Sequence, residues 1–106
     1  MSNTGSHPVT VVITCAIRPD KLEVARQELK AVIRQVMALE PACKGIRVLE
    51  ATDAPHRWLI VEQWESEEVF SGPHMQQPHM RAFMKTAETF LDGKADFEFW
   101  HETFAA

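Results

Sequence analysis

The order in which hydrophobic periodicity changes along this chain is the feature that most limits how it can fold. Residues 7–17 (HPVTVVITCAI) are rich in β-branched side chains and too short for a buried helix, which predicts a strand. Apolar residues then recur at helical spacing from Leu22 to Val36. We expect this helix to end near Leu39, because Pro41 disfavours helical geometry at the residue before it.

Three more segments alternate in polarity or are rich in β-branched and aromatic residues, which predicts strands at 45–52, 58–65 and 95–104. The segment 53–57 (DAPHR) supplies turn residues for a hairpin between the first two of these strands. A second helical region precedes the last strand. The order β-α-β-β-α-β is that of a ferredoxin-like α+β fold, in which helices cover one face of an antiparallel sheet.

The second helical region is expected to consist of two pieces. Ser66 is a suitable N-cap for the first piece, and the Gly72-Pro73 pair should interrupt that piece early. Pro78 suits the first position of the next helix, and Gly93 is a natural stop after it.

The composition narrows the class of protein. A length of 106 residues fits one domain, with residues 1–7 as a flexible N-terminal tail and 8–106 as the folded part. The net charge is −4 and Lys and Arg form no stripe, so neither nucleic acid nor an anionic membrane is an expected partner. Two cysteines are too few for a disulfide framework and the N-terminus has no secretory pattern, which favours the cytoplasm.

Alternation along residues 58–65 leaves neither face of this strand polar. The two faces consist of Trp58, Ile60, Glu62 and Trp64 on one side and Leu59 and Val61 on the other. We expect helices to cover one face of the sheet and a second copy of the chain to cover its aromatic face, which predicts a homodimer. Glu62 is a misfit in its apolar row, because a carboxylate there must be paired, hydrated or neutralised. It is either an ion-pair residue at a wet edge or a pocket residue beside an aromatic wall.

Two histidines lie in the second helical region. His74 and His79 are five residues apart, which is about 140° around a continuous helix, so they cannot form a one-faced zinc pair. No other metal-ligand spacing, phosphate loop, serine elbow or dinucleotide motif occurs. His74 is either a solvated or capping residue near a helix start, or a base that works near neutral pH.

Three segments together resemble the antibiotic biosynthesis monooxygenase family: RPDK at 18–21, EQWES at 62–66 and HMQQPHMRAF at 74–83. The resemblance runs from about Val9 to Phe104. It implies a dimeric α+β barrel, in which two ferredoxin-like sheets pack face to face and each subunit holds a pocket between sheet and helices. Members of the family include cofactor-independent oxygenases of quinols and anthrones, heme-degrading enzymes and sugar-phosphate isomerases.

The resemblance also implies roles for individual residues. Trp64 matches the strand tryptophan of the anthrone oxygenases. Glu62 and His74 match a Glu and a His that recur in quinol-oxygenase and isomerase-like members, and His79 falls in their Pro-His element.

The chain departs from these relatives at several pocket positions. The anthrone oxygenases carry Asn where this chain has Ile60 and Tyr where it has Phe70. Heme degraders carry Asn on the first strand, where this chain offers Thr14 or Ala16. The Gly72-Pro73 pair adds one residue ahead of the helical histidine. The substrate-binding set that we expect is Trp58, Trp100, Thr14, Ile60, Phe70, His79 and Phe83.

These residues suggest oxygenation of a phenolic, quinol or polyketide-type aromatic substrate by O2, without metal, flavin or heme. A deprotonated quinol can itself give an electron to O2, so the protein needs a base, a dry aromatic pocket and an oxyanion donor. We expect His74 to be the base and Glu62 to orient it or to act in its place. Trp64 would donate its indole N–H, with Trp58 and Trp100 as the aromatic wall. The alternatives are a proton-transfer isomerase of a small metabolite, or a dimer that only binds a small molecule.

Overall fold

The computed structural model of the protein describes residues 7–106, so the predicted tail lies outside the described residues except for His7. The predicted β-α-β-β-α-β order is confirmed, with short helical turns added to it. The elements are β1 (Val9–Ala16), η2 (Pro19–Lys21), α1 (Leu22–Leu39), β2 (Cys43–Ala51), β3 (Ala54–Trp64), α2 (Glu67–Val69), η3 (Phe70–His74), α3 (Pro78–Ala87) and β4 (Asp96–Trp100).

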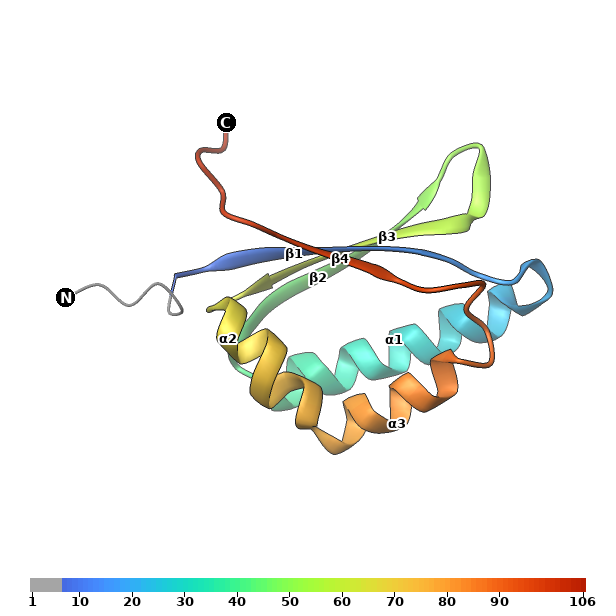
Figure 1. The fold of residues 1–106 in the computed structure, drawn as a ribbon, viewed down its shortest axis with the longest axis horizontal. Helices are drawn as coiled ribbons and strands as arrows, with labels where there is room; N and C mark the ends of the chain where they lie inside the picture. Colours follow the sequence, from blue (N-terminus) through green and yellow to red (C-terminus); the bar gives the residue numbers. More distant parts are fainter. Residues whose placement is uncertain (1–6) are drawn as a thin grey trace.

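The four strands form one antiparallel sheet in the order β2-β3-β1-β4. Helices α1 and α3 lie on one side of this sheet, and none of the described helices covers the other side (Figure 1). The register pairs Val11 with Glu62 and Val9 with Trp64, so these side chains share one face. All four are buried, which identifies this face as the one under the helices.

Helix α1 ends at Leu39, as its sequence predicts. Its buried positions recur every three or four residues at Ala25, Leu29, Val32 and Val36, and they pack into the core with the inward side of the sheet. Full burial of one such Leu or Val side chain contributes roughly 1.5–3 kcal/mol, so this face holds the helix in place. Glu40 follows directly, with its backbone N–H donating to the carbonyl of Val36.

Most strand boundaries differ from the sequence-based prediction by one or two residues, and two of them differ by four. Strand β3 begins at Ala54, four residues earlier than expected, and Pro55 is accommodated at its start. The carbonyl of Pro55 accepts a hydrogen bond from the Trp58 indole at 2.9 Å. Strand β4 ends at Trp100 instead of residue 104, because its last partner on β1 is Thr10, one residue from the start of that strand.

The assignment of the two sheet faces is corrected by the register. The aromatic face that carries Trp58, Glu62 and Trp64 lies under the helices and is not the face left open. The open face instead has an apolar centre that includes Leu59 and Val61 of β3, which the sequence had placed on the opposite side from the tryptophans.

The second helical region keeps the predicted caps but not the predicted break. The hydroxyl of Ser66 accepts a hydrogen bond from the Val69 N–H at 3.1 Å, which confirms it as N-cap. Gly72 and Pro73 do not end the helix. They lie in η3, a π-helical turn, which takes up one extra residue within a continuous helical path. Pro78 starts α3 as expected. No helix within residues 7–106 is long and apolar enough to cross a membrane.

Candidate active site

A cavity of about 270 Å³ lies between the sheet and the helices. Its walls are almost entirely apolar and come from both layers, with Ile13 and Ile60 from the sheet and Val32 and Phe83 from the helices. Four titratable side chains also line it, namely Cys15, Glu62, His74 and Lys94. A mostly apolar cavity with a few polar groups is the usual form of a small-molecule site.

His74 is held at one end of this cavity by Glu40. The Nδ1 atom of His74 lies 2.9 and 3.1 Å from the two carboxylate oxygens of Glu40, and both side chains are buried. An ionised carboxylate only accepts hydrogen bonds, so neutral His74 carries its proton on Nδ1 and its lone pair on Nε2. Nε2 is therefore the atom that His74 offers to a molecule in the cavity.

Glu40 also holds the second histidine. The Nε2 atom of His79 lies 2.6 Å from Oε2 of Glu40, so one carboxylate binds two imidazole rings. Both rings reach the same oxygen pair because η3 and the break before Pro78 change the path of the chain around them. Within residues 7–106, no three His, Cys, Asp or Glu side chains are arranged to hold a metal ion.

The surroundings of His74 make it a neutral base. Burial lowers the pKa of His74, and this effect outweighs the hydrogen bond and the charge of Glu40, which act in the opposite direction. A histidine whose pKa lies below its ordinary value is unprotonated at neutral pH and ready to accept a proton.

Glu62 and Trp64 form a second hydrogen-bonded pair at the same end of the cavity. The indole N–H of Trp64 donates to Oε1 of Glu62 at 2.8 Å, and both residues are buried. Burial raises the pKa of Glu62, the hydrogen bond from Trp64 lowers it, and the nearby charge of Glu40 raises it further, so the net shift is upward. The centroids of the Trp64 and His74 rings are 4.3 Å apart. Trp64 thus lies against both titratable groups.

This geometry corrects two expected roles. Glu40, not Glu62, is the carboxylate that orients His74. The N–H of Trp64 is already donated to Glu62, so it is not free to bind an oxyanion of the substrate.

The structure brings most of the expected substrate-binding residues to the cavity. Those that line it are Trp58, Ile60, Phe70 and Phe83, whereas His79 contacts Glu40 behind the cavity wall. The expectation that Thr14 and Trp100 line the cavity is wrong, because both residues belong to the open face of the sheet. Each is one residue out of phase with an inward-facing neighbour, Ile13 or Phe99, and alternation therefore turns it away.

Glu40 and Cys43 are the residues of this region that the sequence analysis missed. The available signal for Glu40 was its position, since a carboxylate at a helix C-terminus is unfavourable to the helix dipole and needs another reason to be there. Cys43 is buried beside Glu62 and Glu40, and burial raises its pKa to about 11. It therefore remains a thiol at neutral pH.

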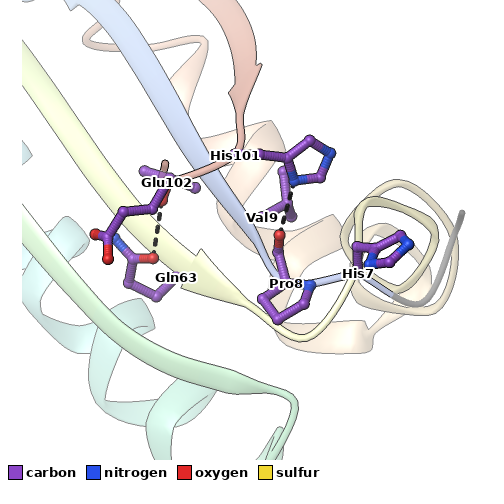
Figure 2. Close-up of a pocket in the computed structure, with 7 residues that line it drawn as sticks. His7, Pro8, Val9, Gln63, His101 and Glu102 are labelled. Atoms are coloured by element: carbon purple, nitrogen blue, oxygen red, sulfur yellow. Dashed lines mark hydrogen bonds between the residues drawn. The ribbon is translucent and has the colours of Figure 1, made fainter. Parts of the chain in front are cut away.

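The surface has larger hollows that lack such chemistry. One of about 620 Å³ lies between the start of β1 and the segment after β4, and His7, Gln63, His101 and Glu102, all exposed, line it (Figure 2). The ring of His101 donates through Nδ1 to the carbonyl of Pro8 at 2.9 Å, which ties the C-terminal segment to the start of β1. The titratable groups of this hollow are solvated, so the candidate active site remains the smaller cavity, which is less open.

The sheet, the helical layer and the site between them define a ferredoxin-like α+β domain with a mostly apolar cavity. The sequence matches the family model of the antibiotic biosynthesis monooxygenases over residues 8–86, and the chain belongs to this family. No functionally curated protein matches the chain in sequence.

Solved structures share the fold at low sequence identity. A candidate antibiotic biosynthesis monooxygenase from Caulobacter crescentus CB15 has a TM-score of 0.86 and 16% identity, with 95% of this chain and 94% of that chain covered. A candidate monooxygenase of the same family from Bacteroides thetaiotaomicron VPI-5482 has a TM-score of 0.84 and 18% identity, with 94% and 93% covered. Rv0793 from Mycobacterium tuberculosis has a TM-score of 0.80 and 21% identity, with 93% and 98% covered.

Proposed function

We propose that this protein is a cofactor-independent monooxygenase that oxidises a small quinol or related phenol with O2. The observation that carries the proposal is the buried Glu40–His74 pair, which presents one unprotonated ring nitrogen to an apolar cavity. The substrate supplies every electron that O2 needs. For a naphthohydroquinone the overall reaction is C10H8O2 + O2 → C10H6O3 + H2O, in which one oxygen atom enters the ring and the other leaves as water.

The first step is proton transfer from a quinol hydroxyl to Nε2 of His74. Glu40 keeps the ring in the required tautomer and stabilises the imidazolium that forms. The resulting quinolate gives one electron to O2, and the two radicals combine to form a carbon–oxygen bond. The imidazolium then protonates the peroxide, which regenerates the base and leaves a neutral ring hydroperoxide.

The apolar walls support this chemistry in two ways. They exclude the water that would stabilise a quinolate nonproductively, and their volume suits a substrate of one or two rings. Phe70 lies edge-on to Trp64, with ring centroids 5.7 Å apart, so an aromatic substrate meets aromatic faces at the reactive end.

A proton-transfer isomerase is the second candidate function. The observation in its favour is that a base, His74, and a carboxyl group of raised pKa, Glu62, occur at the same end of one cavity. Such an enzyme would consume no O2, and this difference separates the two candidates.

We also propose that the protein works as a homodimer. The open face of the sheet carries apolar residues of all four strands, among them Leu49 and Trp100, which are 44% and 55% exposed. A second copy placed on this face would cover them without closing the cavity, which lies on the other side of the sheet.

The experiment that tests the function is O2 uptake with 1,4-naphthohydroquinone under ¹⁸O2, followed by mass spectrometry of the product. We expect one ¹⁸O atom in 2-hydroxy-1,4-naphthoquinone, at a rate above the reaction without enzyme. His74→Ala should lower the rate at neutral pH by about 10²–10⁴, the usual contribution of a general base, and high pH should restore part of it because the quinol ionises unaided.

Glu40→Gln serves as the companion variant. The amide keeps the size of the side chain but cannot stabilise an imidazolium, so we expect slower turnover with little change in KM. Wild-type rates in both variants, or a product without ¹⁸O, would contradict the proposal.

A further inference from the structure

Among residues 7–106, Glu62 is the one carboxyl group that lines the cavity, and the base described above does not use it. Its Oε1 atom accepts the indole N–H of Trp64. Among the described residues, no fully buried side-chain oxygen lacks a hydrogen-bond partner. Within residues 7–106 the second oxygen of Glu62 has no hydrogen-bond partner, so this oxygen is accessible, and the space that Glu62 lines is the cavity.

A ring hydroperoxide in this cavity has two possible fates. Loss of the proton on the peroxide-bearing carbon, with cleavage of the O–O bond, forms a new C=O and expels hydroxide. Elimination across the neighbouring ring carbon instead forms the simple quinone and H2O2. Hydroxide is a poor leaving group, so the first fate needs an acid at the distal oxygen.

We propose that Glu62 is the acid that protonates the departing hydroxide and that Trp64 positions it. This inference rests on the proposed function. His74 removes the carbon-bound proton, the O–O bond breaks, the carbonyl forms, and the hydroxide takes the proton of Glu62 and leaves as water. The imidazolium of His74 then returns a proton to the Glu62 carboxylate, so the site is restored without an external reductant.

The geometry favours separate roles for His74 as the base and Glu62 as the acid over two interchangeable bases. The ring centroid of Trp64 lies 4.3 Å from that of His74, and the indole N–H donates to Glu62, so base and acid both contact one indole at one end of the cavity. Burial also keeps the carboxyl group of Glu62 protonated to a higher pH than usual, because it raises the pKa. The other titratable groups at this end are Glu40 from the end of α1, Cys43 from β2, His74 from η3 and His79 from α3.

The test is the fate of the O2 consumed, measured as the ratio of 2-hydroxy-1,4-naphthoquinone to H2O2 during oxidation of 1,4-naphthohydroquinone. Glu62→Gln keeps an acceptor for the Trp64 N–H but has no proton to give. We expect this ratio to fall by about 10², the lower end of the usual contribution of a general acid. Glu65→Gln, an exposed position on the same chain segment, should leave the ratio at its wild-type value.

Trp64→Phe tests the positioning role through pH. In the wild type, H2O2 should rise as pH passes through the pKa of Glu62, because the ionised form cannot donate. The Trp64 hydrogen bond lowers that pKa, so its loss should move the rise in H2O2 to higher pH. Thermal melts establish that each variant is folded. If Trp64→Phe does not fold, the ratio of hydroxynaphthoquinone to H2O2 in Glu62→Gln is the test of the proposed acid.

The outcomes separate this inference from the function beneath it. If the wild type consumes no O2 with the quinol, the proposed function fails. If the wild type incorporates ¹⁸O and Glu62→Gln gives the wild-type product ratio, the function stands and the role of Glu62 is overturned. An unchanged pH profile in folded Trp64→Phe would overturn the positioning role of the indole.

Discussion

Glu40, a single carboxylate after the last turn of α1, is the residue on which the candidate site depends most directly. It binds His74 and His79 at once, and its side chain is only 7% exposed. An unpaired charge buried in this way would cost several kcal/mol, so the two imidazoles make its burial possible. In return, Glu40 fixes the tautomer of His74. The same side chain therefore contributes to the packing of the buried site and sets the protonation of the proposed base.

Glu62 gives a stability prediction with a definite sign. Its pKa is raised in the folded state, so the folded chain binds the proton more tightly than the unfolded chain. This stability is fully present below pH 4.5, the unfolded value, and is lost as pH rises through the folded pKa. Glu62→Gln has no proton to lose. We therefore expect the Tm of this variant, relative to wild type, to increase as pH rises from 4 to 8.

Each unit of pKa shift corresponds to about 1.4 kcal/mol, and 1 kcal/mol moves the Tm of a domain this size by about 4–8 °C. Differential scanning fluorimetry at closely spaced pH values is sufficient. Glu65→Gln is the control, because Glu65 is exposed and pairs with Lys44 at the surface. A Tm difference for Glu62→Gln that stays constant over this pH range would show that Glu62 has no raised pKa.

At the scale of elements, the π-helical turn η3 decides where His74 lies. A π-turn contains one residue more than an α-turn, and everything after it is rotated by about 100° relative to an uninterrupted α-helix. The residue count of η3, more than the identity of its residues, therefore sets the direction of the His74 ring. Gly72 is the natural place to test this, because a Cβ there would meet no atom within 4 Å.

Deletion of Gly72 should convert η3 into an α-turn and rotate His74 away from Glu40. We expect a folded protein whose turnover falls by about 10²–10⁴, as for loss of the base. Gly72→Ala is the matched control, since it keeps the residue count and should stabilise the helix by about 0.4–1 kcal/mol. NMR titration of the His74 ring should show the lowered pKa in the control but not in the deletion variant. Full activity after the deletion would refute the role of η3.

At the scale of the whole molecule, the uncovered face of the sheet is the main unexplained surface. Helices bury one side, while Val12, Leu59 and Val61 remain only half-buried on the other. A domain of 106 residues gains much from hiding such a face, because small domains bury a limited share of their surface. A second copy that presents the same face is the self-complementary solution.

Leu59→Glu should break this association. The substitution places a charge in the centre of the open face, opposite Leu49 and Thr14, where an unpaired buried charge would cost several kcal/mol in a dimer and little in a monomer. We expect the wild type to sediment as a dimer at micromolar concentration and the variant as a monomer. Leu39→Glu is the control: Leu39 is 63% exposed at the end of α1, on the helical side. A wild type that sediments only as a monomer would contradict the proposal.

Much of the fold was predictable from local patterns in the sequence. The end of α1 at Leu39, the cap at Ser66 and the start of α3 at Pro78 each follow from the chemistry of nearby residues, such as a proline ring or a hydroxyl. The β-α-β-β-α-β order of elements along the chain follows from periodicity. Glu62, Trp64 and His74 were also predicted to form one site, and in the structure they do lie together.

The sequence by itself determined the elements, their order and the residues that alternate together on each strand, because these depend on dihedral preferences and side-chain periods over a few positions. Only the tertiary structure decided which face the helices cover and which hydrogen bonds the buried charges make. Glu40 and His74 are 34 residues apart, and they meet because α1 and η3 pack on the same end of the sheet. Alternation predicts which residues share a face of the sheet, but not the hydrogen-bond partner of each side chain. A buried polar group bonds to whichever donor or acceptor the packing brings within reach.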